Sequence, residues 1–306
     1  MGVSVARIVS KKILDALDKG TIPWRREWLT EKYNAVSGRS YTGVNLILLP
    51  AVGGYLTVNQ IKKLNAKIKK GSKPYLAVFW MKYYYRPETG ERYTEKEIEK
   101  MQFESDYEKT VYLSGFLTAM VLRYYLVYHT SDIENLPDSL IRKRTPLSDT
   151  PKERFSKMID DITNYLNKNG IGFMHDEKTT RAYYSLTKDK IVLPPYKLFR
   201  SESSYLTALA HEVIHSTGHP KRLSRLKEVQ EEEKRAFEEL VAEIGASMLC
   251  SLYGIKPDWE NIASYVESWA KIFKNKPMTI IKAANQSEKA VEFFRLYQKK
   301  TTTKTG

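Results

Sequence analysis

Residues 211–219 read His-Glu-Val-Ile-His-Ser-Thr-Gly-His, and the first five of them form the pattern H-E-x-x-H. On a helix, His211 and His215 leave the same face because they lie four residues apart, so both imidazoles can reach one metal ion. Glu212 follows the first histidine and can accept a proton from a water bound to that metal. The stretch therefore predicts a zinc site with a general base beside it.

The residues around this motif predict a helix that packs on a core. Ser203 or Ser204 is a candidate N-cap, and Gly218 is a candidate C-cap. Apolar residues recur between them at the spacing of one buried helix face: Leu206, Leu209, Ala210, Val213 and Ile214. A pair of core-edge histidines bonded to carbonyl groups is the alternative, but it explains neither Glu212 nor the acidic helix downstream.

A catalytic zinc site needs a third protein ligand. His219 lies eight residues after His211, but zincins with three histidines place the third one two residues later, so the spacing does not fit. The better candidates lie on a second predicted helix, where Glu239 and Glu243 share a face four residues apart. Small residues continue that face, and two carboxylates there require a cation or hydrogen-bond donors. A solvated face that carries both glutamates is the alternative.

The two predicted helices together resemble those of the thermolysin-like gluzincins. In that family a glutamate on the second helix binds the metal, and an acidic residue four positions later orients the first histidine. The resemblance implies that Glu239 is the third ligand and that Glu243 is the hydrogen-bond partner of His211. Glu243 stays open as the alternative ligand.

The composition predicts a cytoplasmic protein with a substantial core. A chain of 306 residues with 42% hydrophobic residues is long enough for one large or two ordinary domains. Its single cysteine, Cys250, excludes an intrachain disulfide framework and fits a reducing compartment. We see no secretory signal and no apolar stretch long enough to span a bilayer, so no membrane partner is expected.

Positive charge is concentrated near the N-terminus. Residues 1–90 contain 16 Lys and Arg residues against five Asp and Glu residues. Aromatic residues are interleaved with them, and cations for phosphates plus rings for unpaired bases are typical of single-stranded nucleic-acid binding. A basic solvated helix beside an aromatic core is the alternative. The candidate DNA-binding residues are Trp24, Arg25, Tyr41, Asn45, Lys62, Lys63, Lys67, Lys70, Lys73 and Trp80.

The patterning along the chain predicts an α+β fold in two parts. Residues 1–131 are expected to form a mixed α/β DNA-binding domain, with a helix over 57–70 and strands over 76–85 and 122–128. The polar residues 132–152 are the expected linker. Residues 153–298 are expected to form a mainly helical zincin-like domain with a small sheet over 181–186 and 190–194, followed by a disordered tail over 299–306.

A family resemblance covers nearly the whole chain. It rests on Gly20-Thr-Ile-Pro-Trp24 and on Tyr33-Asn-Ala-Val-Ser-Gly-Arg-Ser-Tyr41-Thr-Gly-Val-Asn45 in the first part. In the second part it rests on residues 205–219, on Arg222-Leu-Ser-Arg225 and on Glu238-Glu-Leu-Val-Ala-Glu243. These stretches resemble the ArdC-type antirestriction proteins of plasmids, conjugative elements and phages. The resemblance implies a single-stranded-DNA-binding domain joined to a zincin-like metallopeptidase domain, in a protein that shields incoming DNA.

Two functions of different classes follow from these features. The first is a zinc peptidase in which Glu212 takes a proton from water and a peptide substrate aligns along an edge strand near residues 190–194. Tyr183, Tyr184 and His219 are the candidates for stabilising the oxyanion. The second is a non-catalytic DNA-binding protein whose zincin domain is a structural or interaction module. Glu212 favours the first, because a purely structural zinc does not need it.

Overall fold

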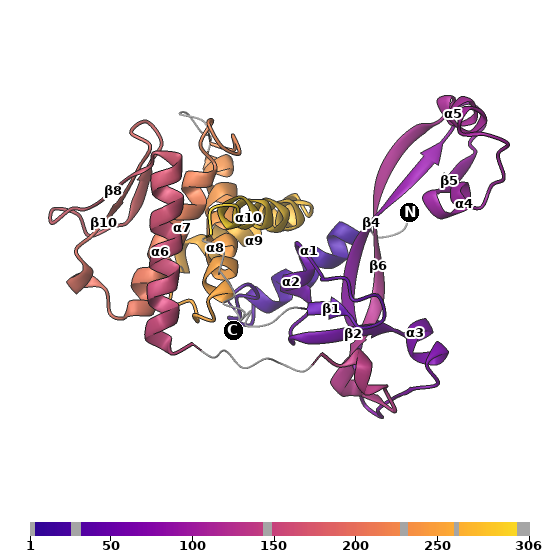
Figure 1. Cartoon of the computed structure of the whole chain (residues 1–306), viewed down its shortest axis with the longest axis horizontal. Coiled ribbons are helices and arrows are strands. Elements are labelled where there is room, and N and C mark those ends of the chain that lie inside the picture. The colour runs from indigo at the N-terminus through magenta and orange to yellow at the C-terminus, as the bar shows by residue number, and fades with distance from the viewer. Residues whose placement is uncertain (1–3, 26–31, 143–148, 227–231, 260–262, 299–306) are drawn as a thin grey trace, which may run out of the picture.

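The computed structural model of this chain describes residues 4–25, 32–142, 149–226, 232–259 and 263–298. It is an α+β structure, as predicted, with a long N-terminal sheet at one end and a helical body with a small sheet at the other (Figure 1). The predicted tail over 299–306 and part of the predicted linker lie outside the described residues. No helix in the described ranges is both long and apolar enough to cross a membrane.

The N-terminal sheet is built around two long strands that are rich in aromatic and β-branched residues, which favour a pleated, half-buried surface. Its strand order is β1-β2-β6-β4-β5, and every pair is antiparallel except β1 with β2. The strands are β1 (Lys32–Asn34), β2 (Gly53–Thr57), β4 (Tyr75–Tyr85), β5 (Arg92–Thr94) and β6 (Leu117–His129). The strands predicted over 76–85 and 122–128 correspond to β4 and to the second half of β6.

The far ends of β4 and β6 form an arm that projects away from the rest of the molecule (Figure 1). The charged residues that follow β4 fold at its tip into β5, α4 (Glu95–Glu99) and α5 (Asp106–Ser114). Helix α4 begins with a capping box, in which the Thr94 hydroxyl accepts from the Glu97 amide and the Glu97 carboxylate accepts from the Thr94 amide. The arm therefore consists of ordered secondary structure held by local caps.

The helix predicted over 57–70 is wrong in its length. Thr57 caps α3 as expected, but α3 spans only Val58–Lys63. Asn65 then takes a left-handed conformation with φ of 55°, which ends the helix. The chain continues as β3 (Lys67–Ile68), which pairs with β7 (Ile133–Glu134), so the first residues of the predicted linker belong to a small sheet.

The C-terminal body is mainly helical, and its small sheet has the order β8-β10-β9. Strand β10 is therefore central, so the expectation that residues 190–194 form an edge strand is wrong. The edges are β8, which pairs in parallel with β10, and β9, which pairs antiparallel. Its elements are α6 (Pro151–Asn169), β8 (Gly172–His175), β9 (Tyr183–Ser185), β10 (Lys190–Leu193), α7 (Glu202–Thr217), α8 (Glu232–Leu252), α9 (Ala263–Asn275) and α10 (Thr279–Arg295).

The N-terminal helix α1 (Val5–Leu17) packs on the C-terminal body, beside α9. Its buried residues Val9 and Ile13 belong to the same apolar core as the helices around the H-E-x-x-H motif. The Ser10 hydroxyl donates to the Phe273 carbonyl oxygen at 2.8 Å. The start of the chain therefore helps to build the core of the domain that carries the metal motif, and the division at residues 132–152 stays a prediction.

Candidate metal centre

Helix α7 carries the H-E-x-x-H motif and is positioned by its ends. Its N-cap is Ser201 and not the expected Ser203 or Ser204, and the side chains of Ser201 and Ser204 cap the helix reciprocally. Gly218 is the C-cap, as predicted. Most of the helix is buried, with α8 and the small sheet packed against it, so the imidazoles project from a rigid support.

Three predicted ligands meet where α7 packs against α8. The Nε2 atoms of His211 and His215 lie 3.1 Å apart. Glu239 from α8 reaches both, with Oε2 at 3.3 Å from His211 Nε2 and Oε1 at 3.6 Å from His215 Nε2. One ligand atom from each of the three residues lies within 4.8 Å of the others. Two imidazole nitrogens and one carboxylate oxygen are a donor set that suits zinc and similar transition metals.

Glu238 is a further residue of this centre, and its role was missed in the sequence. Its Oε1 atom lies 3.5 Å from His215 Nδ1, on the side of the ring away from Glu239. Arg225 holds the same carboxylate through Nη2 at 2.9 Å and Nε at 3.1 Å, and its guanidinium also donates to the Ile214 carbonyl. A carboxylate on the second ring nitrogen fixes the orientation of a metal-binding histidine.

The local field favours a positive charge between the two helices. Burial alone would lower the pKa of His215, but the Glu238 and Glu239 carboxylates raise it to about 10. His211 and His215 in turn hold the pKa of Glu239 far below its usual range, although burial alone would raise it. The centre therefore stabilises a cation where these groups meet, either as a proton or as a metal ion.

Glu212 lies beside the ligands and is only 5% exposed. Burial raises the pKa of its carboxyl group, while the neighbouring His211 and His215 oppose that shift. The Tyr184 amide on β9 also interacts with this carboxylate. A carboxylate whose pKa is raised toward neutrality is a better proton acceptor at working pH than an exposed one.

Glu243 is held by the N-terminal loop. Its Oε1 atom accepts from Trp24 Nε1 and from Arg25 Nε, each at 3.0 Å. The predicted hydrogen bond from His211 is not formed, because His211 Nδ1 is buried without a hydrogen-bond partner in the described part of the chain. Trp24 and Arg25, which were expected to bind DNA, lie instead against the metal centre, and Arg25 stacks 5.3 Å over the Trp259 ring.

The three oxyanion candidates differ in their surroundings. The Tyr184 hydroxyl donates to Asp189 Oδ1 at 2.6 Å and accepts from Arg222 at 2.9 Å, so it belongs to a fixed network. His219 Nε2 lies 3.9 Å from the Asp189 carboxylate in the same network. Tyr183, in contrast, is 45% exposed on β9. All three groups stay candidates for stabilising the oxyanion.

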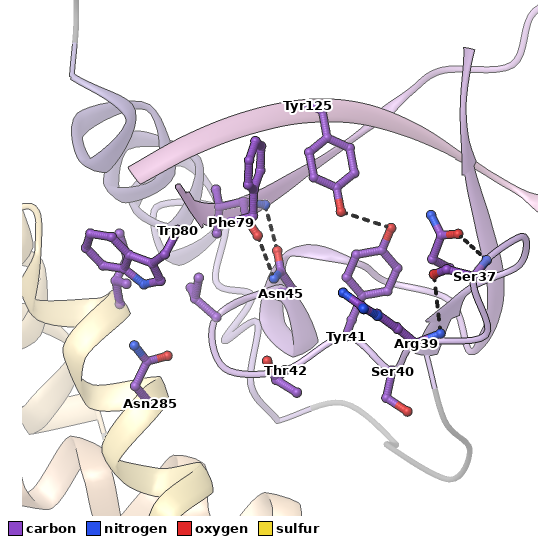
Figure 2. A pocket seen from close by; sticks show the side chains of 14 residues that line it. Ser37, Arg39, Ser40, Tyr41, Thr42, Asn45, Phe79, Trp80, Tyr125 and Asn285 are labelled. Atoms are coloured by element: carbon purple, nitrogen blue, oxygen red, sulfur yellow. Dashed lines mark hydrogen bonds between the residues drawn. The ribbon is translucent and has the colours of Figure 1, made fainter. Parts of the chain in front are cut away.

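The remaining candidate DNA-binding residues fall into two groups. The five lysines are exposed on α3, on β3 and in the turn after it: Lys62, Lys63, Lys67, Lys70 and Lys73. Tyr41, Asn45 and Trp80 instead line one cavity of about 370 Å³ between the N-terminal sheet and α10 (Figure 2). Tyr41 and Asn45 are buried there, while Trp80 is 42% exposed. Sequence reasoning did not foresee that these three residues meet.

Comparison with known proteins finds matches to two separate stretches of the chain. Residues 4–112 match the model of the N-terminal domain of anti-restriction factor ArdC. Residues 160–286 match the model of a zincin-like metallopeptidase domain. The fold and these matches thus define a chain whose two parts resemble an ArdC-type N-terminal domain and a zincin-like domain.

Full-length comparisons extend this result. Two solved structures of the antirestriction protein ArdC from plasmid R388 are 26% identical to this chain. The metal-free one has a TM-score of 0.72 and covers 97% of this chain and 98% of its own, and the Mn(II)-bound one has a TM-score of 0.70 and covers 98% and 100%. The resemblance to ArdC-type antirestriction proteins that was predicted from the sequence is therefore confirmed.

Curated relatives carry other names. The chain is 29% identical over 303 residues to a DNA primase TraC of Escherichia coli and 27% identical over 311 residues to a second one. It aligns over 95% and 96% of its own length but spans only 27% and 20% of these relatives. An uncharacterised protein of Sinorhizobium fredii is 24% identical over 311 residues, with 95% of this chain and 91% of that protein covered.

Proposed function

We propose that this chain is a mobile-element antirestriction protein that carries a zinc-dependent peptidase site and binds single-stranded DNA. The observation that carries the peptidase part is the convergence of His211, His215 and Glu239 on one point, with the buried carboxylate of Glu212 beside them. A structural zinc site is closed by four protein ligands and has no use for an additional buried carboxylate at the metal.

Zinc is the metal that we propose for this site. Two histidines and one glutamate are the protein ligands of known catalytic zinc sites and leave one position open. When bound, zinc supplies Lewis acidity to a water molecule and to a substrate carbonyl. The related ArdC structure from plasmid R388 holds Mn(II), so both metals belong in a test of affinity.

The protein side chains have separate tasks in this proposal. Glu212 accepts the proton of the attacking water, because it is the carboxylate beside the ligand set and its pKa is raised by burial. Glu238, fixed by Arg225, orients the ring of His215. A peptide substrate would extend the small sheet along β9, an edge strand whose Tyr184 amide interacts with Glu212.

The full-length chain, loaded with zinc and incubated with a broad peptide library, tests this activity. We expect cleavage that a chelator stops and that added zinc restores. An inactive wild-type protein that retains stoichiometric zinc would contradict the peptidase proposal. That outcome would favour the alternative, a DNA-binding protein whose zincin domain is an interaction module.

The ligand assignment predicts unequal effects at the two glutamates of α8. Glu239→Ala should weaken zinc binding by roughly a hundredfold to a thousandfold. Zinc sites with four protein ligands have binding free energies of about 10–16 kcal/mol, which is about 2.5–4 kcal/mol for each ligand. Glu243→Ala should change zinc affinity much less, because Trp24 and Arg25 hold its carboxylate. Competition titration with a chromophoric chelator measures both affinities. The opposite order would make Glu243 the ligand.

Single-stranded DNA binding is supported by charge and by shape. The five exposed lysines on and after α3 can contact phosphates, and the cavity beside Trp80 offers aromatic surface to bases. Stacking on rings requires bases that are not already paired, so we propose a preference for single strands over duplex. The full-length chain is the material to use, because α1 belongs to the core of the C-terminal body.

The lysines predict a measurable change in salt dependence. If each of Lys62 and Lys63 neutralises one phosphate, replacing both with Ala should reduce the log–log salt slope of single-strand binding by about 0.7 per lysine, or about 1.4 in total. Fluorescence anisotropy at several salt concentrations gives the slope. The double variant of Lys178 and Lys188, which are exposed in the turns of the small sheet, is the matched control and should leave it unchanged. Equal slopes for all three proteins would remove α3 from the DNA-binding surface.

A further inference from the structure

We propose that the cavity between β4, the loop over residues 37–45 and α10 binds one unpaired base of a nucleic-acid strand, with the adjoining phosphate at Arg39. This inference rests on the proposed DNA-binding function and gives that function a site. The cavity has a volume of about 370 Å³, within the usual range for pockets that hold small ligands. Its lining includes four rings, one cation and three carboxamides: Tyr41, Phe79, Trp80, Tyr125, Arg39, Asn34, Asn45 and Asn285.

Three of the rings form a fixed wall of the cavity. The centroids of Phe79 and Tyr125 lie 5.3 Å apart with their planes inclined by 56°. The Tyr125 hydroxyl reaches the Tyr41 hydroxyl at 3.4 Å, as Figure 2 shows. Tyr41 in turn packs edge-on against the buried Tyr55 ring. A wall that is already ordered loses little conformational entropy when a ligand binds.

Trp80 supplies the ring surface that is still open. It is 42% exposed, although Val78 and Ala77 before it on the same strand are buried. Figure 2 places its indole at the side of the cavity near α10, opposite the Tyr41 and Tyr125 rings. An exposed indole at the mouth of a polar and aromatic cavity is a stacking surface for a base, because every base presents a π-face.

The edge of β4 adds hydrogen-bonding groups at the same place. The Asn45 carboxamide binds the peptide groups of Val78, with its Nδ2 donating to the carbonyl at 2.9 Å and its Oδ1 accepting from the amide at 2.8 Å. Alternate residues of an antiparallel strand direct their peptide groups to the same side, so those of Trp80 face this edge too. Within the described chain, β5 covers the edge only from Tyr83 to Tyr85.

The Asn45 contact shows what kind of ligand fits this edge. A carboxamide matches Val78 because it presents a donor and an acceptor side by side. The hydrogen-bonding edges of nucleobases present the same adjacent donor and acceptor. An unpaired base is therefore a suitable partner for the peptide groups of Trp80, which are the next ones to face this edge of β4. A paired base would have this edge occupied, so the site selects single strands.

The remaining lining of the cavity includes a cation that can hold the phosphate next to the base. Arg39 is exposed in the turn after β1 and faces the cavity, where its guanidinium can bind phosphate. The opposite wall comes from α10, which approaches this loop closely at Gly43. The Gly43 amide donates to the Glu288 carboxylate at 3.0 Å, and a Cβ atom on Gly43 would lie 2.3 Å from Asn285 Oδ1. Gly43 therefore permits the contact that closes the cavity between the two parts of the chain.

The test compares two probes on the full-length protein: a fluorescent oligothymidylate and an abasic oligonucleotide of equal length. Wild type should bind the oligothymidylate more tightly. Trp80→Ala should weaken that binding by roughly 5- to 100-fold, as expected when one base no longer stacks on a ring, and leave the abasic probe unaffected. Arg39→Gln should weaken both probes to a similar degree. Tyr107→Ala, which removes a ring that is 79% exposed on α5, is the matched control and should change neither.

The outcomes separate this site from the DNA-binding function. If wild type binds both probes equally well, the protein contacts only the sugar-phosphate backbone of the DNA, and the proposed base site is wrong. If wild type binds neither probe at low salt, the DNA-binding function fails and the site fails with it. If Trp80→Ala binds oligothymidylate like wild type, with an unchanged melting temperature, the cavity does not hold a base.

Discussion

Glu212→Gln is expected to lower kcat/KM for peptide cleavage by roughly a hundredfold to ten-thousandfold while zinc stays bound. The side chain keeps its size, but an amide cannot accept the proton that a carboxylate takes from the attacking water. His211, His215 and Glu239 are untouched, so zinc affinity should remain within a few-fold of wild type. The substitution replaces a buried carboxyl group, whose pKa burial raises, with a neutral amide, so it should not destabilise the fold.

Parallel measurements on one preparation decide this prediction: cleavage of the best library peptide and zinc content by mass spectrometry. Glu202→Gln is a matched control, since it makes the same change in the first turn of the same helix at an exposed position. It should leave both quantities unaltered. Proteolysis at the wild-type rate by Glu212→Gln would show that another group is the base, and loss of zinc would show that Glu212 supports the metal site directly.

The meeting of the two histidines could be predicted because the relevant spacing is local. A separation of four residues on a helix fixes the relation of His211 to His215 wherever the helix lies. The choice between Glu239 and Glu243 could not be made from spacing alone, since both share a face of α8, and it came from the resemblance to gluzincins. The helix packing puts Glu239 at the histidines and Glu243 at Trp24. Glu238 was missed because its role depends on Arg225, which reaches it only through the tertiary fold.

The errors in the predicted fold arise where the structure of a segment depends on strands that are distant in the sequence. The long strands were found from their aromatic and β-branched residues, which act locally. Strand order has no such local signal, so β10 was taken for an edge although it pairs on both sides. The lysine-rich segment after Thr57 continues a helical pattern, yet the chain leaves the helix at Asn65 to pair β3 with β7.

The candidate DNA-binding rings show the same limit. Trp24, Tyr41 and Trp80 are all aromatic residues in a basic region, so composition treats them alike. In the structure Trp24 is fully buried, Tyr41 forms part of a wall and only Trp80 exposes a large part of its ring. A ring can stack on a base only if its face is open, and that property depends on contacts distant in the sequence.

Trp24→Ala is accordingly expected to act on stability and not on DNA binding. The indole packs edge-on against Trp269 at 5.5 Å and Phe273 at 6.4 Å, and it joins the N-terminal loop to the core of the C-terminal body. Truncating a buried aromatic ring to alanine costs about 3–5 kcal/mol of unfolding free energy. Removing the hydrogen bond to the buried Glu243 carboxylate adds to that cost.

Denaturant titration of the full-length chain, followed by far-UV circular dichroism, measures the loss of stability. Trp24→Phe should be intermediate, because it keeps most of the apolar contact but leaves Glu243 without the indole donor. Trp80→Ala should change the unfolding free energy by much less, since its ring is 42% exposed, while weakening oligothymidylate binding. Trp24→Ala is thus expected to lower stability without affecting DNA binding, and Trp80→Ala to weaken DNA binding with little effect on stability. A Trp24→Ala protein with unchanged stability and weakened DNA binding would place this ring on the DNA, because a buried core residue cannot produce that combination.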